Sequence, residues 1–159
     1  MKRISLALAA LILAGCQNKP ARDYEQLVAR FVIESEAART TEVELPVSGV
    51  KIRVMPKPVI SEFDLVEVAI AQVELGRCLL FQLTPSAARD LYRLSAANQG
   101  RRLVLLLNDQ PVGARVMERP LEGGVVLLFI ERPDAALPTL VERLQRTTAE
   151  IRQEAAKQR

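Results

Sequence analysis

Apolar and polar positions alternate with two different periods along the chain. Between residues 22 and 38 the apolar residues recur every three or four positions, which predicts an amphipathic helix with one apolar face. That face consists of Tyr24, Leu27, Val28, Phe31 and Val32. Packing of this face on the domain is favoured over docking on a partner, although the pattern by itself allows both.

The tail from Asp134 also has a helical period, and Pro138 is tolerated in the first turn of a helix. Its apolar residues step alternately by four and three, which makes a short heptad-like seam. The seam consists of Leu137, Val141, Leu144, Thr148, Ile151 and Ala155. Because the seam extends over fewer than three heptads, we expect a helix lying on its own sheet rather than a coiled coil.

Between these two segments the pattern is mostly that of short β-strands. Strands are predicted at residues 41–45, 50–54, 66–75, 77–83, 101–107, 111–117 and 125–130. Gly76 separates two of them, so residues 66–83 are expected to form a hairpin. One helix interrupts the strands: Thr84 can cap it, Pro85 suits its first turn, and Gly100 is placed to end it.

Strands joined by tight turns favour antiparallel pairing, because parallel strands need long crossover connections. The predicted fold class is therefore α+β, with an antiparallel sheet, packed helices, and flanking amphipathic helices at the N- and C-terminal ends. The length beyond the first fifteen residues suits one domain with a modest core.

The start of the chain has the order of a secretory signal. Lys2 and Arg3 precede an apolar run from Ile4 to Ala14, which is too short to span a bilayer, since a spanning helix needs about twenty residues. The run ends in Leu13-Ala14-Gly15-Cys16, which resembles the lipobox of bacterial lipoproteins. The resemblance implies cleavage before Cys16 and attachment of lipid, such as palmitate, to its thiol. An ordinary signal peptide with a chance cysteine, or a cytosolic apolar N-terminus, is the alternative.

A lipid on Cys16 would hold the protein in the cell envelope, on the periplasmic side. Residues 16–21 would form a tether that reaches roughly 20 Å when extended, so the body would stay close to the membrane surface. In enteric bacteria an aspartate after the lipidated cysteine retains a lipoprotein in the inner membrane, so Gln17 favours the outer membrane. From there the tether is too short to reach an inner-membrane translocon.

The charge distribution argues against a nucleic-acid partner. The chain has 22 Lys and Arg against 19 Asp and Glu, and loss of Lys2 and Arg3 with the signal leaves 20 against 19, a formal net charge of +1. No basic run is longer than Arg101-Arg102, and aromatic residues make up 4% of the chain. Nucleic-acid surfaces need a basic stripe and often stacking rings.

The residue types that catalysis and metal binding need are scarce. The chain has no histidine, which removes the usual general base and the commonest zinc ligand. Two carboxylate pairs are close in sequence, and both are interpreted as surface charges: Asp64 with Glu67, and Glu118 with Glu122. We therefore expect no enzyme activity, no metal and no cofactor, and an enzyme with an unfamiliar site is the least favoured alternative.

The chain has two cysteines. If Cys16 carries lipid, Cys78 has no partner within the chain and no intramolecular disulfide forms. Cys78 lies in a strand-like apolar run, where a buried thiol behaves as a small hydrophobe. A core position is favoured over a reactive thiol, because no histidine is present to activate it.

The stretch Pro56–Glu131 resembles the head subdomain of SecD, which works with SecF in protein export. Pro56–Leu65 resembles the entry into that head, Leu80–Ala88 the following strand and capped helix, and Asn98–Val116 its helix, glycine turn, buried strand, polar turn and next strand. The resemblance implies an α+β SecD-head-like fold and a contact with polypeptide. Because no further stretch resembles a membrane span, it does not imply a proton-conducting part or a force-generating cycle, and that head supplies no catalytic residue.

The predicted organisation is a lipoprotein signal peptide at residues 1–15, a tether and N-terminal helix at 16–40, a SecD-head-like α+β domain at 41–132 and a C-terminal helix at 133–159. The predicted function is non-enzymatic binding of a polypeptide or partner protein, as an accessory to protein export. The alternative is a structural or assembly lipoprotein that docks on an envelope complex through its terminal helices. Binding could use an exposed sheet edge, which can accept an extended peptide through backbone hydrogen bonds, or the apolar face of either terminal helix.

Overall fold

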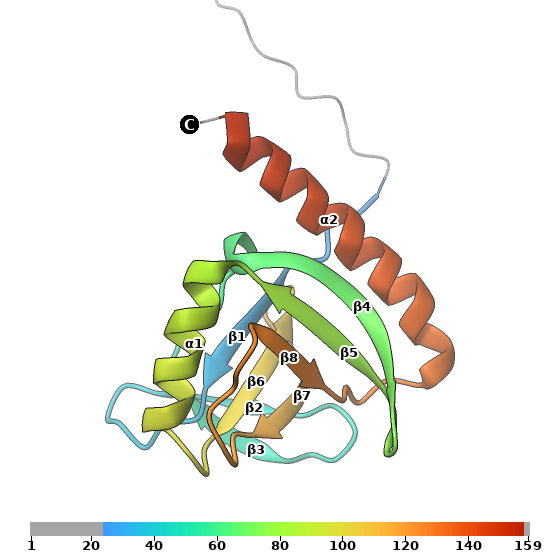
Figure 1. Ribbon diagram of the computed structural model, residues 1–159. Helices are drawn as coiled ribbons and strands as arrows, with labels where there is room; N and C mark the ends of the chain where they lie inside the picture. Colours follow the sequence, from blue (N-terminus) through green and yellow to red (C-terminus); the bar gives the residue numbers. More distant parts are fainter. Residues whose placement is uncertain (1–23, 158–159) are drawn as a thin grey trace, which may run out of the picture.

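The computed structural model describes residues 24–157, and the predicted signal peptide, Cys16 and the whole predicted tether, residues 16–21, lie outside this range. Figure 1 shows short strands wrapped around a common core, with α1 and α2 on the outside. The elements are β1 (Ala29–Ile33), β2 (Thr41–Glu44), β3 (Lys51–Val54), β4 (Leu65–Val73), β5 (Gly76–Leu83), α1 (Pro85–Ala97), β6 (Arg102–Leu107), β7 (Gln110–Val116), β8 (Val125–Leu128) and α2 (Leu137–Lys157), with 3-10 turns at Glu62–Asp64 and Asp134–Ala136.

All strand pairing is antiparallel in the described residues, as the tight turns predict. The strands form three small sheets, with the orders β1-β6-β7, β2-β3 and β4-β5-β8. The predicted hairpin across Gly76 is β4–β5, and the polar turn after β6 leads directly into β7. The predicted α+β class is confirmed, although three sheets replace the one sheet expected.

The predicted N-terminal helix is wrong, since residues 29–33 form strand β1 and pair with β6. Phe31 and Ile33 point into the main core, whereas Val32 packs in a second cluster with Val54 and Val104. A strand buried on both faces is a continuous apolar run, which periodicity cannot distinguish from a helix. Pairing with β6 therefore decides the conformation, and the sheet domain begins before residue 41.

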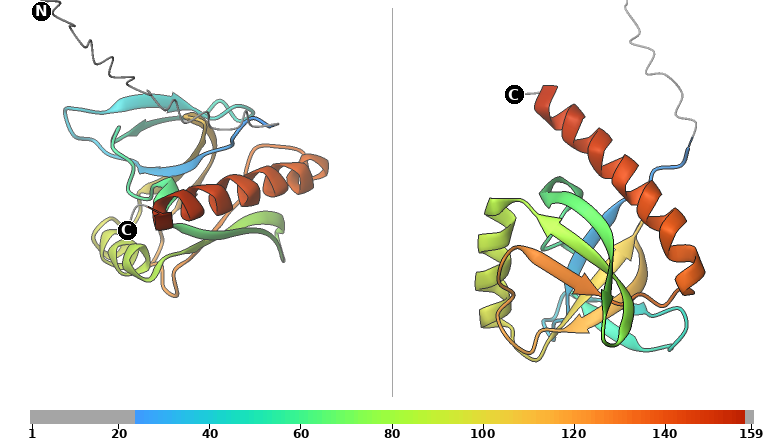
Figure 2. Two further views of the ribbon diagram at one scale, coloured as in Figure 1. Left: turned by 90° about the horizontal axis from the view of Figure 1, so that it is seen from above. Right: turned by 45° about the vertical axis from the view of Figure 1, so that its right-hand side comes forward.

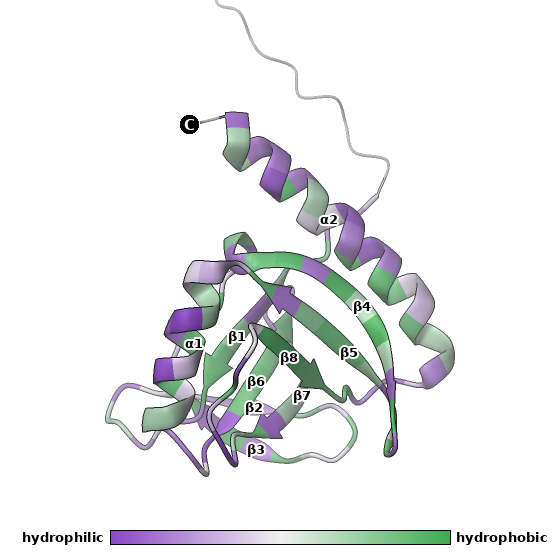
Figure 3. Cartoon of the chain, in the orientation of Figure 1, coloured by the Kyte–Doolittle hydropathy of each residue, from purple (hydrophilic) through white to green (hydrophobic). Residues whose placement is uncertain are grey.

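The main core lies between the sheets that contain β1 and β5. At its centre the rings of Phe31 and Phe81 meet edge to face, with 5.0 Å between their centroids. Helix α1 contributes Leu91 to this core and α2 contributes Leu144, so both helices close the same core. Figure 3 shows the corresponding pattern: most strands are hydrophobic along their length, whereas both helices alternate between hydrophobic and hydrophilic positions.

The two helices begin and pack as their local sequence predicts. Thr84 caps α1 by accepting a hydrogen bond from the Ala87 N–H, and Pro85 is its first residue. Helix α2 lies across β4, and its end extends past the sheets (Figures 1 and 2). The first part of its predicted seam, from Leu137 to Thr148, is buried, which confirms a helix lying on its own sheet.

Candidate functional site

A hollow of about 600 Å³ opens between the edge of β7 and the outer face of β5 and β8. It combines apolar and charged groups, because its lining is Val73, Cys78, Ala114, Arg115, Val116, Glu118, Arg119, Leu127 and Phe129. Two of the apolar side chains are substantially exposed, Val116 at 43% and Phe129 at 42%. An apolar surface that the fold leaves uncovered is a common mark of an interaction site.

The hollow exists because β7 and β8 approach each other at one end only. At the closed end the Glu131 N–H donates to the Val112 carbonyl at 2.7 Å, and Gly113 lies directly against the Phe129 backbone. Among residues 24–157 this is the one backbone hydrogen bond that joins β7 to β8 or to the loop after it. Toward the C-terminal end of β7 the two strands diverge and leave the hollow between them.

The guanidinium of Arg115 bridges the gap where the strands diverge. Its Nη1 donates to the Leu127 carbonyl at 3.0 Å. Arg119 lies nearby on the wall of the hollow, beside Glu118. Neither arginine forms an ion pair with a carboxylate in the described part of the chain. The hollow therefore has two cationic groups that form no ion pair within residues 24–157.

Strand β7 directs alternate backbone groups toward the hollow. The Met117 N–H donates to the Arg101 carbonyl on the β6 side at 2.9 Å. Antiparallel pairing alternates between residues that bond to the partner strand and residues that point away from it. By this alternation, the N–H and C=O groups of Ala114 and Val116 point away from β6 and toward the hollow.

The same alternation applies to β8 on the opposite side. The Leu83 N–H of β5 donates to the Gly124 carbonyl at 2.8 Å. The backbone groups of Val125 and Leu127 therefore point away from β5 and toward β7. The bond from Arg115 to the Leu127 carbonyl agrees with this orientation. Two outer strands of different sheets thus face each other with unused backbone groups between them.

Apart from β7 and the β8 edge that faces it, the edges of β1, β4 and β2 are covered or charged. Residues 55–60 cover β1 with backbone hydrogen bonds. Gln145 and Arg152 on α2 cover β4 by donating to the carbonyls of Val68 and Val66 at 2.8 and 3.2 Å. Strand β2 carries two glutamates in its four residues, and charge on an edge strand discourages pairing with another chain.

Cys78 lies on the floor of the hollow and is free, with 1% of its surface exposed. Burial raises the pKa of its thiol, and the nearby charge of Arg115 opposes this shift only in part. A raised pKa means less of the reactive thiolate at a given pH. The prediction that Cys78 is a buried residue is confirmed.

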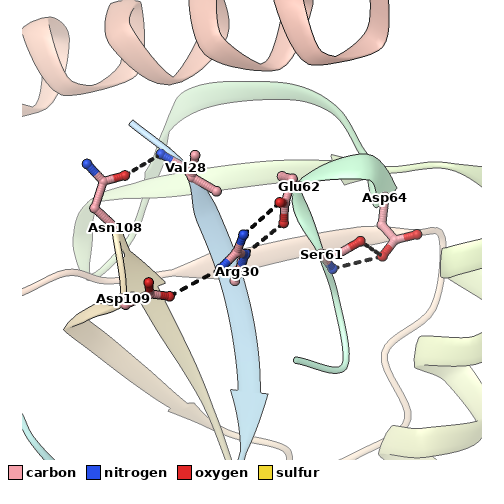
Figure 4. A network of polar contacts seen from close by, with 7 residues as sticks. All are labelled: Val28, Arg30, Ser61, Glu62, Asp64, Asn108 and Asp109. Carbon is pink, nitrogen blue, oxygen red and sulfur yellow. Dashed lines mark hydrogen bonds and ion pairs between the residues drawn. The ribbon is translucent and has the colours of Figure 1, made fainter. Parts of the chain in front are cut away.

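The carboxylate pairs singled out in the sequence do not form sites. Asp64 is used locally, because its carboxylate accepts hydrogen bonds from the Ser61 N–H at 2.8 Å and the Ser61 hydroxyl at 2.7 Å (Figure 4). Glu67, Glu118 and Glu122 are exposed. Glu118 lines the β7 hollow, whereas Glu122 lines a different hollow beside α1.

A partly buried polar network connects β1 to the 3-10 turn at Glu62–Asp64 and to the β6–β7 turn (Figure 4). This network was not predicted from the sequence. The guanidinium of Arg30 donates two hydrogen bonds, each of 2.7 Å, to the carboxylate of Glu62. It also reaches Asp109 in the β6–β7 turn at 3.3 Å. Because these partners are far apart in sequence, no local pattern could have indicated the network. Its hydrogen bonds and ion pairs hold β1 against the two turns, which is a structural role.

The Arg30–Glu62 pair predicts a pH-dependent loss of stability. The hydrogen bonds from Arg30 lower the pKa of Glu62 below its ordinary value of 4.5. A lowered pKa in the folded state stabilises the protein above pH 4.5, and this contribution is lost as the pH falls through the lowered value. At neutral pH, Glu62→Gln should cost about 1 kcal/mol, since Arg30 is partly exposed and solvent screens the pair.

Urea unfolding of the Glu62→Gln variant and the parent protein between neutral and acidic pH measures this effect. The difference in the free energy of unfolding should shrink as the pH falls below 4.5. Glu42→Gln is the matched control, because Glu42 pairs with Lys51 at 3.3 Å but its side chain is 56% exposed. A difference for Glu62→Gln that stays constant with pH would contradict the prediction.

The segment before β1 lies along α2 rather than forming a helix of its own. The Leu27 N–H donates to the Thr147 hydroxyl at 3.0 Å, and the Arg146 guanidinium lies 3.9 Å from the centre of the Tyr24 ring. The apolar face of α2 is in turn packed on the body. Of the two kinds of surface considered from the sequence, the structure therefore offers the sheet edge, whereas the expected N-terminal helix face does not form and the face of α2 is packed from Leu137 to Thr148.

Neither a metal-binding cluster nor a membrane-spanning helix occurs in residues 24–157. No group of three or more cysteine, histidine, aspartate or glutamate side chains in residues 24–157 is arranged to hold a metal ion. No helix within the same range has the length and apolar character needed to cross a membrane.

No protein-family model matches the sequence, and no curated protein matches it. Solved structures do match. A crystal structure of SecDF in a super-membrane-facing form aligns with a TM-score of 0.57 at 17% identity, covering 74% of this chain and 18% of that chain. A structure of SecDF, described as a membrane component that enhances protein export, aligns with a TM-score of 0.58 at 17% identity, covering 76% of this chain and 62% of that chain.

This chain therefore spans less than two thirds of either structure that it resembles. At 17% identity the likeness establishes the fold and not the activity. The resemblance seen in the middle of the sequence is confirmed at that level: the described residues have a fold similar to part of SecDF.

Proposed function

We propose that the protein is a lipid-anchored extracytoplasmic protein whose SecD-like module binds polypeptide without catalysis, as an accessory to protein export. The observation that carries this proposal is the open edge of β7 above the hollow, which combines apolar and charged groups, whereas the edges of β1, β2 and β4 are covered or charged. An open edge beside an apolar surface suits an extended chain, because backbone groups bind any sequence and apolar side chains find a place to pack.

The fold likeness supports the same proposal. One of the two similar structures is of a SecDF that enhances protein export. An unfolded chain in transit exposes backbone and apolar side chains, and these are the two features that the hollow complements. The absence of histidine from the sequence supports a role in binding rather than in acid–base catalysis.

The anchor limits which polypeptides the module would meet. The lipobox-like residues Leu13–Cys16 carry the proposed anchor, and the eight peptide steps from Cys16 to Tyr24 span at most about 28 Å. With Gln17 favouring the outer membrane, the module would meet polypeptides in the periplasm after they leave an inner-membrane translocon. Docking on an envelope complex through the terminal helices is not favoured, because β1 replaces one helix and the first half of α2 is packed on the body.

Site-specific photocrosslinking in cells tests the binding role. A photoreactive amino acid at position 116 should capture exported polypeptides, and capture should stop when secretion is blocked. The matched control is position 47, where Val47 is 78% exposed in the β2–β3 turn and does not line the hollow. Equal capture at both positions, or none at position 116, would remove the proposed binding role.

The anchor has a separate test by membrane fractionation. The Cys16→Ser variant should be lost from the membrane fraction, whereas the parent protein should remain in it. Retention of the variant in the membrane fraction would contradict lipid attachment at Cys16 without affecting the crosslinking result.

A further inference from the structure

We propose that the bound polypeptide adds to β7 as an extended strand, and that Arg115 and Arg119 favour a segment carrying an acidic residue. This inference rests on the proposed function and specifies how its ligand is held. The occupant is an extended segment of another polypeptide, running along the β7 edge with alternate side chains directed into the hollow.

The outer edge of β7 has backbone groups that an added strand could use. The N–H and C=O groups of Ala114 and Val116 point away from β6, so an added strand can pair with both residues by continuing the β1-β6-β7 sheet. Pro111 occupies the first half of the same strand, as proline does in edge strands. The pairing positions are therefore confined to the end of β7 that borders the hollow.

The apolar side chains that line the hollow could pack against the side chains of an added strand. In an added strand, every second side chain points to the same face. On that face the strand would meet Leu127 and Phe129, which are apolar and incompletely buried. An apolar residue of the ligand would bury surface against them, at roughly 25 cal/mol for each Å² removed from water. Residues with β-branched side chains suit this arrangement, because they favour strands.

The charged side chains that line the hollow favour one kind of ligand. Arg115 and Arg119 outnumber the single carboxylate, Glu118, that lines the hollow. The one hydrogen bond of Arg115 across the gap goes to a neutral carbonyl, Leu127. A carboxylate is a stronger acceptor for a guanidinium than a carbonyl is, because both partners are charged. An acidic residue in the ligand would therefore be preferred over a basic one.

The test uses the full chain, purified from membranes in detergent, and fluorescently labelled peptides of alternating valine and threonine. One peptide carries a central aspartate and its partner carries a central lysine. Fluorescence anisotropy should show tighter binding of the aspartate peptide, by roughly tenfold. In the Arg119→Gln variant this preference should fall severalfold.

Backbone pairing is tested separately from side-chain contact. By the alternation of the β6–β7 ladder, the Val116 N–H points away from β6. Val116→Pro removes this N–H and should weaken binding roughly tenfold. Val116→Thr keeps that N–H and should bind like the parent protein. Aspartate peptides N-methylated at alternate positions give the same test without changing the protein: methylation in one register should weaken binding, and methylation in the other should not.

The outcomes separate this inference from the function on which it rests. If the peptides bind but neither register of N-methylation nor Val116→Pro weakens binding, strand addition is wrong and polypeptide binding stands. Equal affinity for the aspartate and lysine peptides would remove the acidic preference. If neither the peptides nor a permanently unfolded protein, such as reduced and carboxymethylated lactalbumin, binds at all, polypeptide binding itself is wrong.

Discussion

Replacement of Phe31 by alanine is expected to lower the free energy of unfolding by about 3–5 kcal/mol. Phe31 is completely buried, and its ring lies edge to face with the ring of Phe81 at 5.0 Å. The substitution removes the aromatic pair and leaves a cavity between the two three-stranded sheets, where the rigid strands around it cannot easily collapse.

Chemical denaturation of the Phe31→Ala variant and the parent protein measures this loss. Phe63→Ala is the matched control, because the same atoms are removed from a side chain that is 62% exposed in the turn before β4. The control should change the free energy of unfolding by no more than about 0.5 kcal/mol. Similar values for the two variants would show that the core is not centred on Phe31.

Replacement of Gly113 by alanine is expected to destabilise the protein by about 3 kcal/mol and to separate the closed ends of β7 and β8. An added Cβ would collide with the Phe129 carbonyl oxygen and would lie 3.0 Å from the Ile130 Cα. Both obstacles are backbone atoms, so they cannot move aside as the end of a flexible side chain can. The cost is steric, because Gly113 is not one of the glycines with a positive φ.

Urea unfolding measures the stability of the Gly113→Ala variant, and amide hydrogen exchange measures the separation of the strands. The Glu131 N–H, which donates to Val112 at 2.7 Å, should exchange faster. Gly123→Asn is the control, because a Cβ at this position would meet no heavy atom within 4 Å and asparagine tolerates a φ of +72°. Unchanged stability and unchanged exchange at Glu131 would contradict the close approach.

The closed end and the open end of the β7–β8 pair have different causes. Gly113 and Glu131 bring the strands together, whereas the side chain of Arg115 spans the place where they diverge. If β7 and β8 paired along their whole length, the two sheets would merge and the edge would disappear. The candidate site therefore depends on a small residue at one position and a long charged residue two positions later.

Several features were predictable because they depend on residues that are close in sequence. Thr84 and Pro85 mark the start of α1, and Gly76 lies at the β4–β5 turn. In both, the decisive contacts join residues at most four positions apart. The antiparallel arrangement followed from the same local turns.

The region before residue 41 was not predictable, for a physical reason. The spacing of Leu27, Phe31 and Val32 suits a helix, but Phe31 pairs with Leu105, and that contact lies in a part of the chain that the local pattern does not include. Burial on both faces of β1 erased the alternation that usually identifies a strand. The Arg30–Glu62 pair was missed for the same reason, since the two residues are 32 positions apart.

Local sequence was enough to specify the α+β class, most of the strands and both observed helices, because turns, caps and apolar periods act within a few residues. It also contains the Leu13–Cys16 pattern on which the proposed anchor rests. Only the folded chain shows that β1 is a strand, that α2 and residues 55–60 cover two edges, and that the edge of β7 stays open. Those features arise from pairing between distant segments, and no local pattern of residues specifies which backbone groups remain without a partner.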